Sequence, residues 1–238
     1  MGPHIRNRNG RLGGLHLELQ VLENHPRRVL YLHGFASGPR SRKALYFAER
    51  LRALGFQVDI PDLAEGNFEG LTIGGQLRLV ERLAQNQPVV LIGSSLGGYV
   101  ASLYAARHPE VELLILLAPA FHFIGLWESE LTSQQMEAWR ENGKMRVYHY
   151  GADREMSIGF QLLEDAKRFE PFPDFRQPAL IVHGNQDSSV PVQYSIDFAQ
   201  AHPNVQLVRV ESGHELTDVL DRIWRESEKF LLANQVSK

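Results

Sequence analysis

Short apolar runs alternate with longer amphipathic stretches along most of the chain. The apolar runs are rich in branched residues and end near Gly, Pro or His, which is typical of buried strands. The longer stretches repeat apolar side chains three or four positions apart and therefore indicate helices. We expect strands at 29–32, 56–60, 89–92, 113–117, 179–182 and 205–210, and helices at 41–54, 72–86, 96–107, 192–201 and 216–232.

Strands that alternate with helices imply βαβ units, in which parallel strands are covered on both faces. Because such crossovers are right-handed, the pattern predicts an α/β fold with an open, doubly wound, mostly parallel sheet. An earlier segment, residues 15–21, alternates apolar and polar side chains and fits a half-exposed strand near a sheet edge. We expect one domain over residues 15–238, preceded by a flexible tail at 1–14.

The alternation is interrupted once, between residues 121 and 173. This segment shows no convincing strand and carries two weak helical patterns, at about 132–142 and 157–169. An insertion of this length between two strands predicts a short helical lid over the sheet. The alternative is an irregular loop with one packed helix.

The sharpest motif is Gly93-Ser94-Ser95-Leu96-Gly97-Gly98, which follows a buried strand and opens a helix. In the pattern G-x-S-x-G, Gly93 and Gly97 flank Ser95. Ser94 cannot be the central serine, because Ile92 and Leu96 would then replace the glycines. A serine at the tip of such a turn has a strained backbone that exposes its hydroxyl, and Ser95 is therefore the candidate nucleophile.

A serine hydroxyl needs a base, and the base needs an acid that orients it. His214 lies in the loop after the strand at 205–210, whereas His202 ends a helix. Asp187 is the single carboxylate in the loop after the strand at 179–182. Because active loops follow the carboxyl ends of parallel strands, we predict His214 as base and Asp187 as acid. The alternatives are a surface histidine and a turn-forming aspartate.

Acyl transfer also needs two N–H donors for the developing oxyanion. Leu96, the residue after the candidate nucleophile, should supply one of them. Phe35, in the loop His33-Gly34-Phe35, should supply the other, with His33 anchoring that loop. Candidates for the substrate pocket are His33, Phe121, His122 and Trp127.

Composition narrows the function further. The net charge of −3 and the pI of about 6.4 argue against a nucleic-acid-binding protein. The absence of Cys excludes thiolate catalysis and cysteine-ligated metal sites. No apolar stretch is long enough to span a membrane, and no signal peptide is evident, so we expect a cytoplasmic protein. No spacing suggests a metal site, although a metal shared by His33 and His183 stays an alternative.

Taken together, these motifs resemble the α/β-hydrolase superfamily over residues 15–232. The resemblance rests on His33-Gly34-Phe35, the serine turn, His183-Gly184-Asn185-Gln186-Asp187 and Gly213-His214, in that order along the chain. The first two look like those of the small YqiA-like bacterial esterases, and the insertion at 121–173 looks like the lids of serine-aminopeptidase-like and acyl-thioesterase relatives. The family fold implies an eight-stranded sheet, of which this chain could lack an outer strand. Glu215 departs from the aromatic or small residue that many relatives carry after the histidine.

The sequence thus predicts a serine hydrolase that cleaves a carboxylic ester or thioester of a small-molecule acyl substrate without a cofactor. A peptidase or a C–C bond hydrolase would use the same three residues, and the lid and pocket would decide between them. The alternative without catalysis is a protein with the same fold that only binds a small molecule. The sequence leaves the natural substrate and the oligomeric state open.

Overall fold

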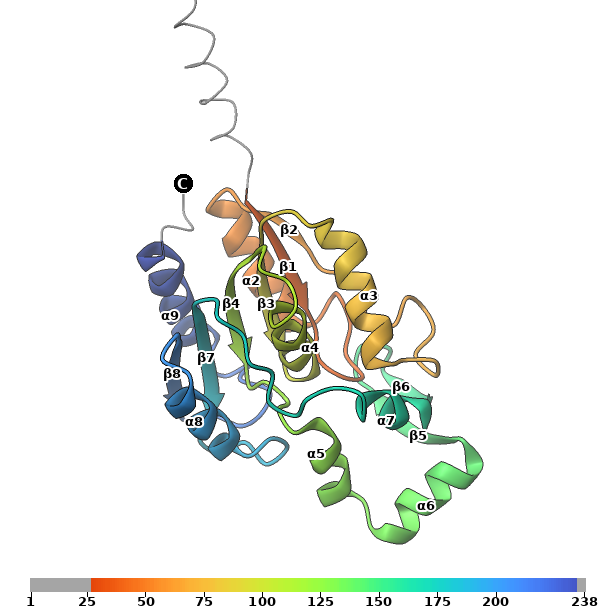
Figure 1. Ribbon diagram of the computed structural model, residues 1–238. Coiled ribbons are helices and arrows are strands. Elements are labelled where there is room, and N and C mark those ends of the chain that lie inside the picture. The colour runs from red at the N-terminus through yellow and green to blue at the C-terminus, as the bar shows by residue number, and fades with distance from the viewer. Residues whose placement is uncertain (1–26, 235–238) are drawn as a thin grey trace, which may run out of the picture.

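The computed structural model describes residues 27–234, which form a parallel sheet covered by helices on both faces (Figure 1). Within these residues, the sheet consists of β1 (Arg28–Leu32), β2 (Gln57–Asp59), β3 (Val89–Ser94), β4 (Val111–Leu117), β7 (Ala179–Gly184) and β8 (Val205–Val210). Their spatial order is β2-β1-β3-β4-β7-β8, and each neighbouring pair is parallel. The predicted doubly wound α/β sheet is confirmed.

Two hydrophobic layers hold the helices on the sheet, because successive side chains of a strand point to opposite faces. The helices that pack on the sheet are α2 (Arg42–Ala53), α3 (Ile73–Ala84), α4 (Leu96–Ala105), α8 (Val192–Ala201) and α9 (Leu220–Ala233). Leu30 and Leu32 of β1 belong to the layer with α3 and α4, whereas Val29 and Tyr31 belong to the layer with α2 and α9. Strands β3 and β7 are buried along their whole length, as a central parallel sheet requires.

The insertion at 121–173 contains more structure than its sequence predicted. It holds α5 (Phe123–Glu130), α6 (Ser133–Asn142), β5 (Lys144–His149), β6 (Arg154–Gly159) and α7 (Gln161–Ala166). The expectation that it has no strand is wrong, since β5 and β6 pair as an antiparallel hairpin. The helix expected at 157–169 starts only at Gln161, because Ser157, Ile158 and Gly159 belong to β6.

The hairpin was hard to predict because β6 passes from exposed to buried residues without alternating, so the alternation of β5 has no matching partner in the sequence. Exposed and partly buried residues alternate strictly along β5, and its exposed positions carry Lys144, Arg146 and Tyr148. Trp139 of α6 anchors the hairpin, since it is buried and its Nε1–H donates to the Ile158 carbonyl at 3.1 Å. The insertion therefore packs as a helix–hairpin unit.

Two expectations lie outside the described residues, namely the strand at 15–21 and the tail at 1–14. The sheet of residues 27–234 has six strands, compared with the eight implied by the resemblance. No helix within these residues combines the length and the apolar character needed to span a bilayer.

Candidate active site

Three loops at the carboxyl edge of the sheet bring together residues that are distant in sequence. Ser95 directly follows β3, Asp187 follows β7 and His214 follows β8. All three strands run in the same direction, so their following loops meet at one edge. The fold thus places Ser95, Asp187 and His214 within reach of one another.

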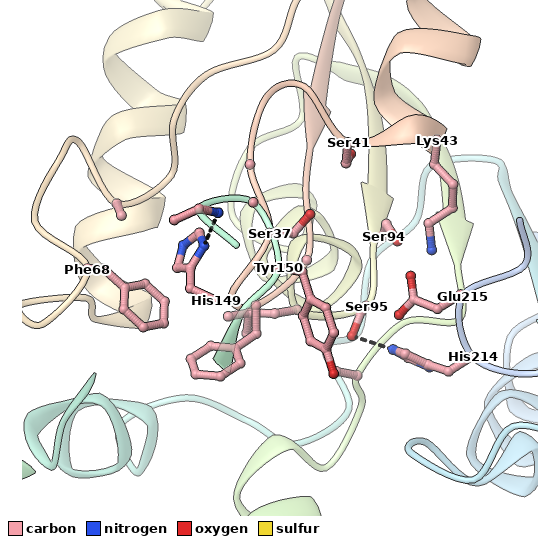
Figure 2. Close-up of a pocket in the computed structure, with 18 of the residues that line it drawn as sticks. Ser37, Ser41, Lys43, Phe68, Ser94, Ser95, His149, Tyr150, His214 and Glu215 are labelled. Carbon is pink, nitrogen blue, oxygen red and sulfur yellow. Dashed lines mark hydrogen bonds between the residues drawn. The ribbon is translucent and has the colours of Figure 1, made fainter. Parts of the chain in front are cut away.

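Ser95, His214 and Asp187 form a continuous chain of hydrogen bonds (Figure 2 shows the first of them). The Ser95 hydroxyl donates to His214 Nε2 over 2.9 Å, and His214 Nδ1–H donates to Asp187 Oδ2 over 2.7 Å. Both distances lie within the range of ordinary hydrogen bonds. This arrangement fixes one imidazole tautomer, with the proton on Nδ1 and a lone pair directed at the serine hydroxyl.

Asp187 is a buried carboxylate whose two oxygens are both engaged. Oδ1 accepts the N–H groups of Ser189 and Val190, at 2.9 and 2.8 Å. Oδ2 accepts from His214 and lies 3.1 Å from His183 Nε2. Burial by itself raises the pKa of Asp187, but the hydrogen bonds from His183, His214 and Val190 outweigh it and hold this pKa well below its usual range.

Ser95 occupies a backbone conformation that L-residues rarely adopt, with φ 53° and ψ −118°. Backbone hydrogen bonds keep it there, because its N–H donates to Leu117 O at 2.9 Å and its carbonyl accepts from Ala120 N–H at 3.0 Å. A Cβ on Gly97 would come within 3.0 Å of the carbonyl oxygens of Leu32 and His33. The glycine that follows Ser95 in the motif is therefore a steric requirement of a turn packed directly against β1.

The predicted oxyanion donors are the backbone N–H groups of Phe35 and Leu96. Among the described residues, neither the Phe35 nor the Leu96 N–H donates a hydrogen bond. Leu96 is the first residue of α4, so its N–H lies at the positive end of that helix. The loop of Phe35 follows β1, next to β3 in the sheet. A Cβ on Gly34 would meet Ser95 Cβ at an ordinary 3.4 Å, so Gly34 is not required for their approach.

A cavity of about 980 Å³ opens at Ser95. This volume is that of a small-molecule site. One wall is aromatic and apolar, with Phe35 packed 5.4 Å from the rings of both Phe68 and Trp127. The insertion supplies Trp127, His149 and Tyr150 to this wall, among other residues. Residues of the insertion and the candidate site residues therefore line the same cavity.

Of the four residues predicted for the substrate pocket, only one lines the cavity. Trp127 lines the cavity, whereas His33, Phe121 and His122 do not. His33 is buried below the loop, where its Nδ1–H donates to Gly34 O at 3.0 Å and its Nε2 accepts the Leu63 N–H at 3.2 Å. Burial lowers the pKa of His33, which suits a neutral anchor for the loop. Phe121 is buried against Phe198 in the core, with 4.5 Å between ring centroids.

Sequence reasoning missed several residues that line the cavity. His149 and Tyr150 were missed because the β5–β6 hairpin was not recognised. His149 packs edge-on against Phe68, with 4.6 Å between centroids, and its Nδ1 accepts the Ala152 N–H (Figure 2). Lys43 was missed because a lysine in an amphipathic helix is normally solvated, and only the position of α2 at the cavity shows otherwise.

His33 and His183 do not share a site. His183 is fully buried, and its Nδ1 accepts the Ser195 hydroxyl proton at 2.8 Å while its Nε2–H faces Val190 O and Asp187. Within residues 27–234, no three side chains of metal-ligating type gather in a geometry that could hold an ion.

Comparison with known proteins places the chain in a family. The sequence pattern of the uncharacterised protein family UPF0227 matches residues 28–230. The chain belongs to this family. Its sheet, crossing helices and loop positions are those of the α/β-hydrolase fold, so this UPF0227 member has the fold that its motifs predicted.

Curated relatives and solved structures agree with this placement. Bovine mitochondrial palmitoyl-protein thioesterase ABHD10 is 24% identical over 213 residues, covering 81% of this chain and 68% of the relative. The AB hydrolase superfamily protein YisY of Bacillus subtilis is 25% identical over 261 residues, covering 90% and 92%. The structure of mouse alpha/beta hydrolase domain-containing protein 10 superposes with a TM-score of 0.72 at 21% identity, covering 88% and 90%. These similarities agree with the α/β-hydrolase fold of this chain.

Replacing Gly97 tests the packing of the serine turn. Gly97→Ala should lower the free energy of unfolding by about 2–3 kcal/mol, because the new Cβ collides with the main chain of β1 and its loop. Gly38→Ala is the matched control and should be nearly neutral, since a Cβ there meets nothing within 4 Å. Urea unfolding followed by circular dichroism measures both. Equal stability of the two variants would contradict the steric account.

Asp187→Asn tests the pKa argument. The folded-state pKa of Asp187 lies below its unfolded value of about 3.9, so the carboxylate stabilises the fold above that pH and loses this contribution as pH falls through the folded pKa. The stability deficit of Asp187→Asn should therefore be full at neutral pH and should narrow below about pH 4. Urea titrations at several pH values measure the gap, with the exposed Asp197→Asn as control. A deficit independent of pH would refute the assignment.

Proposed function

We propose that the protein is a serine hydrolase that cleaves carboxylic esters or thioesters, with Ser95 as nucleophile, His214 as base and Asp187 as orienting acid. The observation that carries the proposal is the hydrogen-bonded chain of these three side chains at the floor of a cavity. The hydrogen bond from Ser95 to His214 has the geometry needed for proton removal, because a base must lie within hydrogen-bond reach of the proton that it takes. The hydrogen bond from His214 to Asp187 has the geometry needed to orient the base.

In the first half of the reaction, His214 Nε2 takes the proton of Ser95 as Oγ attacks the acyl carbon. Asp187 accepts from Nδ1–H, keeps the imidazole oriented and stabilises its positive charge. Its depressed pKa keeps Asp187 ionised throughout the neutral range. The imidazolium then protonates the departing alcohol or thiol, and an acyl group stays on Ser95.

In the second half, a water molecule replaces the leaving group. His214 removes a proton from this water, which attacks the acyl carbon, and the imidazolium returns the proton to Ser95 Oγ as the acyl–oxygen bond breaks and the carboxylic acid leaves. The N–H groups of Phe35 and Leu96 serve as the oxyanion hole in both halves, since both residues line the cavity with Ser95 and neither N–H donates a hydrogen bond within residues 27–234. The strained backbone of Ser95 presents Oγ to all of these groups at once.

The substrate class follows from the cavity wall. Phe35, Phe68 and Trp127 form an apolar surface that suits the hydrocarbon part of an acyl group. The bovine relative is a palmitoyl-protein thioesterase by name, which supports an acyl ester or thioester over a peptide. We therefore assign the aromatic wall to the acyl group.

Ser95→Ala tests the nucleophile. It should lower kcat/KM for p-nitrophenyl esters and acyl-thioesters by a factor of about 10⁴ or more, because removal of a triad member leaves only binding and the oxyanion hole. Its thermal unfolding should stay close to that of the wild type. A panel of increasing acyl length, run on both proteins, also measures which acyl groups the wall accepts.

A fluorophosphonate probe separates an enzyme from a binding protein on the same scaffold. The probe should label the wild type at a single site, and peptide mass spectrometry should place the label on Ser95 and not on Ser94. Absence of labelling, or ester cleavage that persists in Ser95→Ala, would show that Ser95 is not the nucleophile.

A further inference from the structure

The side of the cavity formed by the start of α2 is rich in positive charge. Residues 38–43 line it, and Arg154 of the hairpin lines the same cavity. Among the described residues, no carboxylate lies within ion-pair distance, 4.0 Å, of these cations, namely Arg40, Arg42, Lys43 and Arg154. Three carboxylates also line the cavity, those of Asp62, Glu130 and Glu215.

Lys43 differs from the three arginines because it is buried. The residue is only 8% exposed, and it lines the cavity. Within the described residues, Nζ makes neither a hydrogen bond nor an ion pair. Nζ itself keeps some contact with the cavity, and an ammonium of a largely buried residue that has no protein partner suits an anionic ligand that enters this cavity. Burial lowers the pKa of Lys43, whereas Glu215 and Asp187 act to raise it.

The amino end of α2 adds to the positive potential at Lys43. This helix has 12 residues, no acidic residue in its first turn and no side-chain cap from Ser41. Helix amino ends carry partial positive charge, so Arg42 and Lys43 are unfavourable neighbours there unless an anion binds. Uncapped N–H groups and an unpaired ammonium on one cavity wall match the requirements of a carboxylate or phosphate.

Lys43 lies on the leaving-group side of Ser95. His214 must protonate the leaving atom, so the leaving group has to lie on the side of the imidazole. Glu215 directly follows His214, and Figure 2 shows Lys43 descending beside Ser94 toward the Glu215 carboxylate. Phe68 of the apolar wall lies on the opposite side of Ser95 in this view. Acyl and leaving groups therefore meet walls of different chemistry.

We infer that Lys43 and the amino end of α2 form an anion subsite that binds a carboxylate or phosphate on the alcohol or thiol leaving group. This inference rests on the proposed function and specifies its substrate class, an apolar acyl group joined to a negatively charged leaving group. Glu215 faces Lys43 from the other side but is exposed, so water solvates its carboxylate. It opposes the anion and so limits its affinity.

Matched leaving groups test the subsite. Butyryl thioesters of mercaptoacetate, mercaptoethyl phosphate and the neutral mercaptoacetamide share their acyl group and differ in charge. We expect the wild type to have a higher kcat/KM for the charged thioesters than for the neutral one. Lys43→Met should reduce this ratio by about tenfold, as expected for loss of a charge-assisted hydrogen bond. The response of the two anionic thioesters distinguishes a carboxylate site from a phosphate site.

Controls separate a local effect from a general one. Lys229→Met removes the same charge from an exposed position on α9 and should leave the ratio unchanged. Lys43→Arg should restore part of the preference. Because Glu215 is exposed, Glu215→Gln should fold, and it should raise the charged-to-neutral ratio. A ratio unaffected by Lys43→Met, or lowered by Glu215→Gln, would overturn the subsite, as would an equal loss on all three thioesters.

Equilibrium binding makes the result independent of turnover. Isothermal titration of Ser95→Ala with the uncleaved thioesters should show tighter binding of a charged thioester than of the neutral one. The Ser95→Ala, Lys43→Met double variant should lose this difference. If no thioester is cleaved yet the binding difference persists, the proposed reaction fails and the subsite stands. If cleavage occurs without any discrimination by charge in rate or binding, the subsite fails alone.

Discussion

The close packing of the serine turn against β1 is the constraint on which the rest of the structure depends. Ser95 holds φ 53°, and its main chain is fixed by hydrogen bonds to Leu117 and Ala120 at the end of β4. Such strain persists only where surrounding contacts over-determine it. Only glycine fits at position 97, because a Cβ there would collide with the main chain of Leu32 and His33. The same contact brings the loop of Phe35 next to the serine.

Sheet and insertion contribute differently to the site. The sheet supplies the groups whose mutual geometry matters, from loops anchored by buried hydrogen bonds such as those of Asp187 and His183. The insertion supplies surface, with Trp127 and Tyr150 lining the cavity and Trp139 holding the hairpin to its helix. Reaction chemistry can thus stay fixed while substrate choice varies with the insertion and with the start of α2.

The sequence predicts the sheet and the candidate triad because both depend on local signals. Apolar runs mark β3, β7 and β8, and Ser95, Asp187 and His214 each follow one of them. It fails for the β5–β6 hairpin, because β6 lacks the alternation of exposed and covered residues that β5 has. It also fails for His122, which follows β4 yet does not line the cavity, and for Lys43, whose burial depends on how α2 meets the loops. Such properties come from tertiary contacts.

The most direct test of the central claim is a crystal structure of the protein after reaction with a phosphonate ester. The account predicts a covalent bond from phosphorus to Ser95 Oγ, with the phosphonyl oxygen accepting the N–H groups of Phe35 and Leu96. His214 should stay hydrogen-bonded to Asp187, with its Nε2 directed at the leaving-group side of the adduct. Phosphorus bonded to another residue, or a phosphonyl oxygen pointing away from both N–H groups, would contradict the account.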